Sequence, residues 1–414
     1  MTAATKTPTA ATHEAEARPA LHLRVLTKRF GAIEAVAGVD LALRQGEFLT
    51  LLGPSGSGKT TILKMIAGFE RPTSGAIELA GRDVSSLSPA ERGIGVVFQQ
   101  YALFPHMNVH DNISYPLKLR RWSAEDRARR VEAMLELVEL TGYGERFPRE
   151  LSGGQQQRVA VARALAFQPA LLLMDEPLGA LDRALRVGMQ EEIRRIHRES
   201  GATVLYVTHD QEEALTMSDR VAILREGHLL QVGSPRELYR RPADRFVATF
   251  FGESTLVPAI KLAEVDAEHV RVHALGREAT VRRGGPLPGE DVALAIRPGK
   301  LRLEAKADDL RLQTMVVDVL YLGDAVRIVG HNPEAGQVLV RADSDEAATV
   351  RIGQQLALGF APRDAVAVGG APSPPARSPT EVADTARYRL WTVERRARTR
   401  APTCPTPPEL AFLA

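Results

Sequence analysis

The sequence has few of the features that mark secreted, membrane-spanning or nucleic-acid-binding chains. Its 414 residues contain one cysteine, Cys404, so no disulfide can form within the chain and a reducing compartment is the default. No apolar run approaches the roughly 20 residues that cross a bilayer. The opening stretch MTAATKTPTAATHEAEARPA lacks the apolar core of a secretory signal. A net charge of +2 does not favour a nucleic-acid partner. We therefore expect a soluble chain whose membrane role, if any, depends on another protein.

Four segments of different composition follow one another along the chain. Residues 1–20 are rich in Ala, Thr and Pro, which is typical of a disordered arm. From about 21 to 254, short apolar runs alternate with helical patterns, which predicts an α/β fold with a mainly parallel sheet and a helical insertion at about 106–165. Residues 255–368 alternate apolar and polar positions between turns and predict a small all-β, barrel-like domain. The tail, 369–414, again has the composition of disorder.

The stretch GPSGSGKTT, residues 53–61, fits the pattern G-x-x-x-x-G-K-[ST] of a phosphate-binding loop. The apolar run EFLTLLG leads into it and TILKMIAG follows, so the loop joins a predicted strand to a predicted helix. Glycines allow backbone N–H groups to face phosphate oxygens, and the helix N-terminus adds positive potential. We expect Lys59 to reach the β- and γ-phosphates of a nucleotide and Thr60 to ligate Mg²⁺ through its hydroxyl.

Polar residues also follow two further apolar runs, ALLLMDEP and ATVLYVTHD. Because ligands collect at the carboxyl ends of such strands, Asp175 suits the positioning of Mg²⁺ and Glu176 suits accepting a proton from water. His209, at the end of the second run, is placed to contact a γ-phosphate. Gln99, in VVFQQYALFP, can orient water or metal. Phe30, in LTKRFGAIEAV, can stack on an adenine ring, although core packing explains its local pattern nearly as well.

The stretch LSGGQQQRVAVARALA has two glycines and three glutamines where a helix should begin. Ser152 and Gln155 fit the S-x-x-Q capping-box pattern, so we expect Ser152 to cap this helix. Gly153 and Gly154 then leave the N–H groups of the first turn bare of side chains, which makes the helix start an anion site. One nucleotide would bridge this helix start and the phosphate loop if the two came from different copies of the chain.

Taken in order, GPSGSGKTT, Gln99, LSGGQ, LLLMDEP, LGALD and His209 resemble the motifs of the nucleotide-binding subunits of ABC (ATP-binding cassette) transporters. The resemblance covers about residues 21–250 and implies a P-loop ATPase that uses ATP and Mg²⁺ and works as a homodimer with two ATP molecules between its subunits. It implies catalytic roles for Glu176 as general base, His209 as switch histidine, Gln99 as sensor of the metal and water, and Lys59. The nucleotide contacts it implies are Phe30, Gly53, Pro54, Ser55, Gly56, Ser57, Gly58, Lys59, Thr60, Thr61, Ser152, Gly153, Gly154, Gln155 and Asp182. The metal ligands it implies are Thr60, Gln99 and Asp175.

Two further stretches resemble bacterial importers. FQQYALFPHMNVHDNISYPLKLR is similar to the segment that receives a coupling helix of a membrane subunit, and Tyr101, Leu103, Phe104 and Pro105 would form its apolar socket unless they are core residues. Residues 255–368 resemble the C-terminal regulatory (OB-type, TOBE-like) domain of subunits that import polyamines, sugars, ferric iron or molybdate and sulfate, most closely the spermidine/putrescine group. The resemblance implies two integral membrane permease subunits and a periplasmic or extracellular solute-binding protein. It also implies a peripheral location on the cytoplasmic face of the inner membrane.

Two other classes of ATPase share these motifs. A chromosome-maintenance or repair ATPase would carry a long heptad insertion between the phosphate loop and the LSGGQ stretch, and no sustained heptads occur there. A factor acting on ribosomes would carry two sets of motifs, whereas this chain has one. Interleaved acids favour a solvated helix face over a lipid or nucleic-acid patch for one basic cluster, which consists of Lys118, Arg120, Arg121, Arg127, Arg129 and Arg130.

Overall fold

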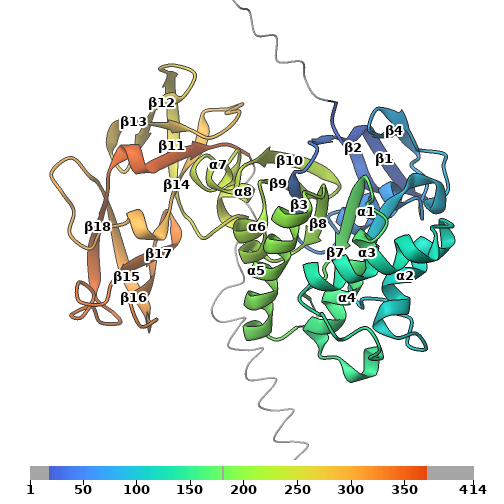
Figure 1. The fold of residues 1–414 in the computed structure, drawn as a ribbon. Helices are drawn as coiled ribbons and strands as arrows, with labels where there is room; N and C mark the ends of the chain where they lie inside the picture. The colour runs from blue at the N-terminus through green and yellow to red at the C-terminus, as the bar shows by residue number, and fades with distance from the viewer. Residues whose placement is uncertain (1–17, 180, 371–414) are drawn as a thin grey trace, which may run out of the picture. The chain divides into compact units, whose positions relative to one another are not determined.

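The computed structural model describes residues 18–179 and 181–370, which Figure 1 colours along the chain. The predicted arm at 1–20 and tail at 369–414 lie almost wholly outside the described residues. The described chain forms an α/β region as far as helix α8, followed by a region of β-strands and short 3-10 turns. The predicted fold class, a P-loop α/β unit followed by small barrel-like sheets, is therefore confirmed. No helix in the part of the chain described is long and apolar enough to span a membrane.

A six-stranded sheet contains the strands predicted from the apolar runs. Its order is β10-β9-β3-β8-β7-β6, and all neighbours are parallel except β10 and β9. Its strands are β3 (Phe48–Leu52), β6 (Ile94–Val97), β7 (Leu171–Asp175), β8 (Val204–Thr208), β9 (Arg220–Arg225) and β10 (His228–Gly233). Every residue of β3 and β8 is buried, which is why these strands read as continuous apolar runs. The parallel order places Gly53, Glu176 and His209, which follow β3, β7 and β8, at one edge of the sheet.

A four-stranded antiparallel sheet, β2-β1-β4-β5, departs from the mainly parallel architecture predicted for residues 21–254. Its strands are β1 (Leu21–Phe30), β2 (Ile33–Leu43), β4 (Ser74–Leu79) and β5 (Arg82–Asp83). Leu21, Leu23 and Leu26 of β1 are buried in the core that also holds helix α1 (Lys59–Ala67), while the residues between them face outward or are half-buried. A sheet that is solvated on one side needs only alternate apolar residues, which is a weaker sequence signal than a continuous apolar run.

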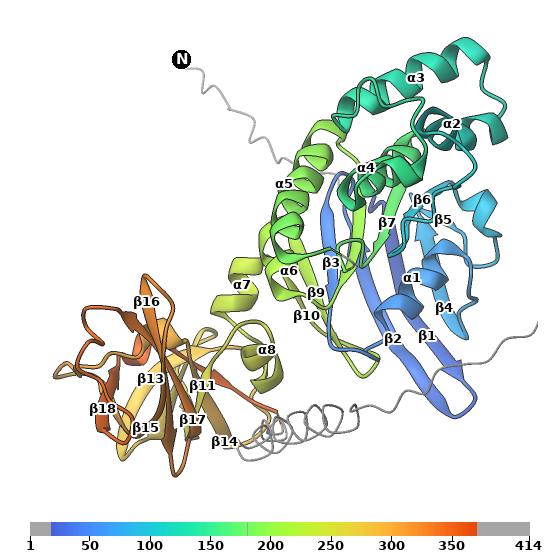
Figure 2. The ribbon, with the colours of Figure 1, turned by 90° about the horizontal axis from the view of Figure 1, so that it is seen from below.

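The predicted helical insertion consists of α2 (Val109–Leu119), α3 (Ala124–Leu137) and α4 (Gly153–Leu165), which lie together in Figures 1 and 2. The apolar face of α3, formed by Val131, Met134 and Leu135, is buried in one hydrophobic core with residues of α2 and α4. The remaining helices are α5 (Arg183–Ser200), α6 (Gln211–Met217), α7 (Pro235–Arg240) and α8 (Arg245–Phe250). Helices α4 and α1 thus belong to two cores that cover opposite faces of the parallel sheet.

The region after α8 forms two sheets over one core. A closed barrel has the order β11-β12-β13-β19-β14, and a separate four-stranded sheet has the order β17-β16-β15-β18. The barrel strands are β11 (Thr255–Glu264), β12 (His269–Ala274), β13 (Arg277–Arg283), β14 (Asp291–Ile296) and β19 (Ala365–Val368). The strands of the second sheet are β15 (Leu310–Tyr321), β16 (Ala325–Asn332), β17 (Gly336–Asp343) and β18 (Gln355–Phe360). Apolar residues of both sheets share one hydrophobic cluster. The predicted barrel is therefore accompanied by a second sheet, and the alternation of apolar and polar residues in the sequence did not distinguish the two sheets.

Candidate functional site

The loop between β3 and α1 has a backbone that requires glycine at defined positions. Gly58 precedes α1 with φ 96°, in the left-handed region, and a Cβ there would lie 2.5 Å from the carbonyl oxygen of Ala35. A Cβ at Gly53 would lie 2.3 Å from the carbonyl oxygen of Leu224. Gly56 also has a positive φ of 80°, with open space around it. The loop is therefore held close to neighbouring backbone by two of its glycines, and it exposes N–H groups at the start of α1 of the kind that bind phosphate.

Lys59 places its ammonium group inside this loop. Its Nζ donates hydrogen bonds to the carbonyl oxygens of Gly53, at 2.7 Å, and Pro54, at 2.9 Å. The residue is 6% exposed. Burial lowers the pKa of Lys59, and the negative charges of Glu176 and Asp175 oppose this change. The loop thus holds a cation beside two acids, an arrangement suited to a bound phosphate chain.

Thr60 and Asp175 bring a hydroxyl and a carboxylate together at the end of β7. Burial raises the pKa of Asp175, and the charge of Glu176 adds to the rise, whereas Lys64, Lys59 and a hydrogen bond with Thr60 lower it. In the described residues there is no cluster of three or more His, Cys, Asp or Glu that could hold a metal by itself. The pair still fits Mg²⁺, because magnesium sites at phosphates use one or two protein oxygens and complete their shell with water and substrate oxygens.

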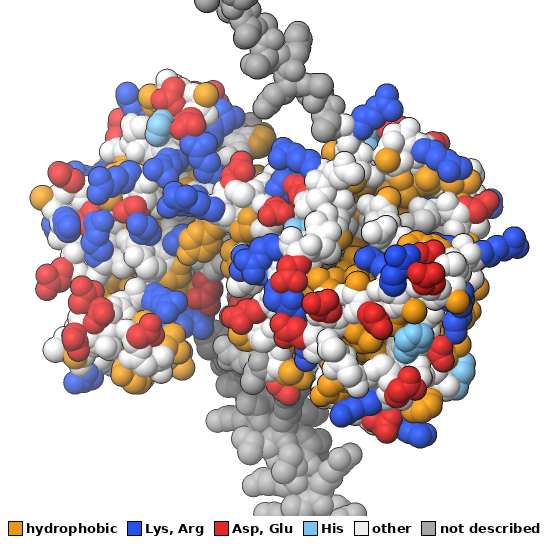
Figure 3. All heavy atoms as spheres, in the orientation of Figure 1, with side chains coloured by type: hydrophobic (Ala, Val, Ile, Leu, Met, Phe, Trp, Pro, Cys, Tyr) orange, Lys and Arg blue, Asp and Glu red, His pale blue; other side chains and the backbone are white. Residues whose placement is uncertain are grey.

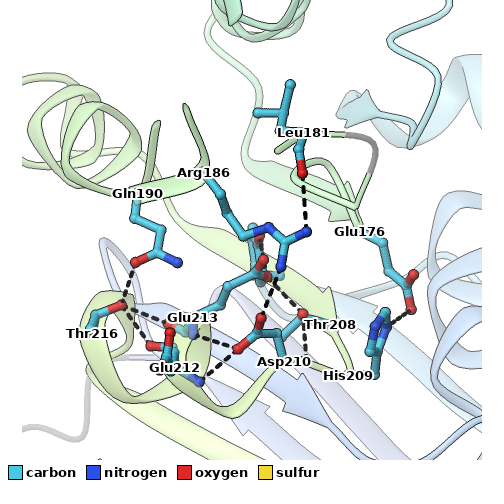
Figure 4. A network of polar contacts seen from close by, with 11 residues as sticks. Glu176, Leu181, Arg186, Gln190, Thr208, His209, Asp210, Glu212, Glu213 and Thr216 are labelled. Carbon is cyan, nitrogen blue, oxygen red and sulfur yellow. Dashed lines mark hydrogen bonds and ion pairs between the residues drawn. The ribbon is translucent and has the colours of Figure 1, made fainter. Parts of the chain in front are cut away.

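Glu176 and His209 meet across the ends of β7 and β8 (Figure 4). His209 Nδ1 lies 3.0 Å from Glu176 Oε1. Because a carboxylate only accepts, Nδ1 carries a proton in this contact, and Nε2 is the nitrogen that remains for a ligand. The His209 side chain is 60% exposed. Glu176 has φ 43°, which a non-glycine residue seldom adopts, and its N–H donates to the carbonyl oxygen of Val207 at 2.9 Å.

Gln99 lies beside the turn that follows Glu176. A Cβ placed on Gly179, in the turn after Glu176, would lie 3.3 Å from Gln99 Nε2. The structure therefore brings Gln99, Glu176 and His209 to the same edge of the sheet as the phosphate loop. The sequence did not predict the contact between Glu176 and His209, because the two residues are brought together by the parallel pairing of β7 with β8 rather than by local spacing.

The predicted capping box is present at the start of α4. Gln155 N–H donates to Ser152 Oγ at 3.3 Å, and Ser152 N–H donates to Gln155 Oε1 at 3.0 Å. The reciprocal bonds hold both side chains against the backbone, and Gly153 and Gly154 add no side chain of their own. The first turn contains no acidic residue. Within the first turn of α4, no side chain of Gly153 or Gly154 covers the N–H groups and no acidic residue neutralises the positive end of the helix dipole.

The two helix starts that suit phosphate belong to different hydrophobic cores. Ile62 and Ile66 of α1 are buried with the antiparallel sheet and the parallel strands. Val159 and Ala162 of α4 are buried with α2, α3 and the alternate residues of the parallel strands, such as Tyr206. The two anion sites are thus held by cores on opposite faces of one sheet.

Asp182 and Phe30 are both exposed, as their predicted contacts with nucleotide require. Asp182 Oδ1 accepts from the N–H of Leu185 at 2.9 Å, so Asp182 caps α5 while remaining exposed. Phe30 is 48% exposed at the end of β1, with Lys28 Nζ 4.8 Å from its ring centroid. This exposure rules out core packing for Phe30, and stacking on adenine stays a prediction.

The four residues expected to form an apolar socket do not share one environment. Tyr101 is buried in the core of the helical insertion, so core packing is the correct interpretation for it. Leu103 is half-buried against the same core. The Phe104 ring is half-buried, 4.7 Å from that of Tyr115 between centroids, and Pro105 is exposed. Pro105 is therefore the exposed member of this group, while Leu103 and Phe104 are half-buried.

The basic cluster at the end of α2 and start of α3 is largely engaged within the chain. The Arg120 guanidinium lies 3.6 Å from the ring centroid of Phe167, and Arg130 donates to backbone carbonyls at the end of α4. Lys118 and Arg129 form ion pairs with acids. On the face shown in Figure 3, acidic and basic side chains are interspersed over α2 to α4. These contacts agree with a solvated helix face and offer no single-sign patch.

Sequence reasoning missed three residues of the polar network beside His209, namely Arg186, Asp210 and Glu213 (Figure 4). Asp210 and Glu213 offered one signal, because D-x-x-E before a helix is a capping pattern and Asp210 does cap α6. Arg186 offered none, since its partners are set by the packing of α5 beside α6.

The comparisons with known proteins agree with this geometry. The family profile described as ABC transporter matches residues 36–179, and the TOBE domain profile matches residues 294–368. The spermidine/putrescine import ATP-binding protein PotA of Rubrobacter xylanophilus is 44% identical over 361 residues, which is 86% of this chain and 95% of that protein. The protein of the same name from Acidothermus cellulolyticus is 48% identical over 330 residues, covering 78% of this chain and 85% of its own length. The structure of cbiO1 from Clostridium perfringens, part of the ABC transporter complex cbiONQ, matches 54% of this chain and 91% of its own, with a TM-score of 0.51 and 26% identity.

The ABC transporter profile spans the phosphate loop, Gln99, the LSGGQ helix start and the two acids after β7. The TOBE profile spans strands β14 to β19. The matched segments thus cover most of the candidate site, without Phe30, Asp182 and His209, and most of the second β region, and the relatives extend the match over most of the chain. The chain therefore belongs to the ABC transporter family, as an ATPase whose ATP-binding cassette is followed by a TOBE domain.

Proposed function

We propose that this chain is the ATP-hydrolysing subunit of an importer of spermidine and putrescine. The observation that carries the proposal is the pairing of two separate phosphate-binding helix starts with a water-activating acid, in a chain similar over most of its length to import ATP-binding proteins. Import of sugars, ferric iron, or molybdate and sulfate would use the same ATPase chemistry, so these solutes are the alternatives. Binding of nucleic acid or ribosomes is not supported by any feature of the site.

In this proposal two copies of the chain form two nucleotide sites, and each site is assembled from parts of both copies. The phosphate loop of one copy binds the triphosphate, while Ser152 to Gln155 of the second copy cover the γ-phosphate. Lys59 balances the charge of the phosphates, Phe30 stacks on adenine, and Asp182 lies at the contact between the copies. The bare start of α4 suits this role, because nothing within its own first turn competes for the N–H groups.

Hydrolysis needs a water molecule to lose a proton as it attacks the γ-phosphate. Glu176 is the acceptor of that proton, and His209, bonded to Glu176 through Nδ1, holds the carboxylate in orientation. Gln99 positions the water from the far side of the turn at Gly179. Mg²⁺ held by Thr60, Asp175 and Gln99 would neutralise charge on the phosphate oxygens.

The membrane connection runs through other polypeptides. In this proposal a helix of a permease subunit docks a few residues after Gln99, where Pro105 is exposed and Phe104 is half-buried beside Tyr115. Two such permease subunits would place this chain on the cytoplasmic face of the inner membrane, and a periplasmic solute-binding protein would deliver the polyamine. Closing and opening of the ATPase dimer would then drive transport.

Mixed dimers test whether the site is shared between copies. Ser152→Arg blocks the α4 start and Lys59→Ala disables the phosphate loop, so each variant alone should have little ATPase activity. A heterodimer pairs one intact loop with one intact α4 start and should regain about half of the activity of the unaltered chain, since one site of two is complete. If confirmed heterodimers show no more activity than the two separate variants, the shared site is wrong.

The solute is tested with the reconstituted transporter. Stimulation of ATP hydrolysis and uptake of labelled spermidine or putrescine into proteoliposomes would support polyamine import. Stimulation by a sugar, ferric iron or molybdate instead would replace the polyamine and leave the ATPase role intact. A pull-down that recovers ribosomes or nucleic acid, and no integral membrane protein, would contradict the importer altogether.

A further inference from the structure

Arg186, in the second turn of α5, holds two loops of the site at once (Figure 4). Its Nη2 donates to the carbonyl oxygen of Leu181 at 3.1 Å, and its Nη1 donates to Asp210 Oδ2 at 3.3 Å. Leu181 directly precedes Asp182, and Asp210 directly follows His209. Its Nε is buried without a partner among the residues that the structure describes, so the two outer nitrogens fix the guanidinium. One side chain therefore joins the segment that caps α5 to the segment that carries the histidine.

Asp210 uses its two carboxylate oxygens for two separate tasks. Oδ1 accepts from the N–H groups of Glu212, at 2.8 Å, and Glu213, at 3.4 Å, and so caps α6. Oδ2 accepts from Arg186. An asparagine in this place keeps an oxygen for the cap but presents an NH₂ group to the guanidinium. The contact with Arg186 can thus be removed without removing the cap.

The other neighbour of His209 is held from inside the protein. Thr208 Oγ1 accepts from the N–H of Asp210 at 3.0 Å and donates to Glu213 Oε2 at 2.7 Å. Glu213 also accepts from the hydroxyl of Tyr206, which is fully buried in the middle of β8. This side of the histidine loop is therefore built into the core. The Arg186 contact, between half-buried side chains at the surface, is the part of the attachment that can adjust.

We propose that Arg186 is a positioning residue that couples the segment at Leu181 and Asp182 to His209, and through His209 to the orientation of Glu176. The proposal rests on the proposed function, in which Asp182 lies at the contact between two copies of the chain. When a second copy presses on that segment, the carbonyl of Leu181 carries the guanidinium with it, and Asp210 follows. The contact between His209 and Glu176 is already present in the single chain, and in this proposal the second copy, acting through Arg186 and Asp210, brings the pair into the orientation that activates water.

Arg186→Gln and Asp210→Asn, singly and together in the full-length chain, test this coupling. Each single variant should lower kcat for ATP hydrolysis by about 3- to 30-fold, the range expected when a coupling network is interrupted. The KM for ATP should change less than about twofold, because neither residue contacts the proposed nucleotide position. The double variant should be no slower than the slower single variant, since both changes remove the same contact. Lysine can keep the ion pair with Asp210 but cannot also hold the carbonyl oxygen of Leu181 in the same way, so Arg186→Lys should have a kcat between those of Arg186→Gln and the unaltered chain.

Arg195→Gln is the matched control on the same helix. Arg195 pairs with Glu192 and Glu199 away from the site, so its loss should alter thermal stability while leaving kcat unchanged. A merely structural role for Arg186 would show the same pattern as this control. The proposal is overturned if the single variants hydrolyse ATP at the normal rate, or if their losses multiply in the double variant. Failure of the proposed function gives a different result, because mixtures of Ser152→Arg and Lys59→Ala chains would then regain no ATPase activity.

Discussion

Replacing Gly153 with alanine should make the folded chain more stable and the enzyme slower. Gly153 is the first residue of α4 and lacks a positive φ, so alanine fits its backbone. A Cβ there would lie 3.4 Å from Leu181 Cδ2, which is ordinary van der Waals contact. Glycine to alanine at a compatible position stabilises by about 0.4–1 kcal/mol, because the unfolded chain loses freedom. For a domain of about 150–250 residues that corresponds to a rise in melting temperature of about 1–4 °C.

The same methyl group should interfere with the proposed phosphate contact. Every Cα–Cβ bond of a helix tilts toward its N-terminus, so the added methyl projects toward the space in front of the first turn. Loss of one hydrogen bond to a charged group costs about 1.5–3 kcal/mol. If that bond forms in the transition state, kcat falls by about 10- to 150-fold. Thermal unfolding without nucleotide and steady-state phosphate release at saturating MgATP measure the two effects separately.

Gly188→Ala provides the matched control. Gly188 lies in α5, exposed, with no heavy atom within 4 Å of an added Cβ. Its replacement should raise the melting temperature by a similar amount and leave kcat unaltered. If Gly153→Ala is more stable yet hydrolyses ATP at the normal rate, the first turn of α4 does not meet the phosphate, and the reasoning is refuted. If Gly153→Ala and Gly188→Ala lose activity equally, the loss comes from the lower flexibility of the helices and not from a blocked phosphate contact at the α4 start.

Three further predictions concern single residues. Glu176→Gln should retain ATP binding while hydrolysis falls by about 10²- to 10⁴-fold, as measured by nucleotide titration and phosphate release; near-normal turnover would remove Glu176 as general base. Gly58→Ala should abolish nucleotide binding and lower thermal stability, because its Cβ would lie 2.5 Å from a backbone oxygen at a φ of 96°; unchanged binding would show that the loop can rearrange. Burial raises the pKa of Glu213 above its ordinary 4.5, so the folded chain holds this proton more tightly than the unfolded chain and loses stability as pH rises through that window. Glu213→Gln should therefore gain in free energy of unfolding relative to the unaltered chain as pH is raised, and a difference independent of pH would contradict this.

The elements that could be predicted from the sequence are those with strong local signals. β3, β7 and β8 are buried on both faces and therefore appear as short continuous apolar runs. The Ser152–Gln155 capping box spans a single turn, so both of its hydrogen bonds follow from spacing alone. The phosphate loop was recognisable because its glycines and lysine are consecutive along the chain.

Features formed by contacts between distant segments could not be predicted. The pairing of β1 with β4 depends on which half-buried strands meet after folding. Tyr101 lies in an apolar stretch that suits a core and a docking surface equally, and only the packing of the helical insertion around it decides between them. The contact of Arg186 with Asp210 joins α5 to α6, and one arginine among the many of this chain carries no local mark of its partner.

A single copy of the chain contains nearly every group that hydrolysis requires, yet the proposed mechanism makes it inactive alone. Lys59, Asp175, Glu176 and His209 all lie at one edge of one sheet, so a second copy is not needed to bring them together. What the second copy adds is the α4 start over the γ-phosphate and pressure on the segment before α5. The α4 start and the phosphate loop are held in separate cores on opposite faces of the same parallel sheet. Control of hydrolysis therefore resides in the contacts between these parts, and Arg186 is the contact that reaches Glu176 from the dimer interface.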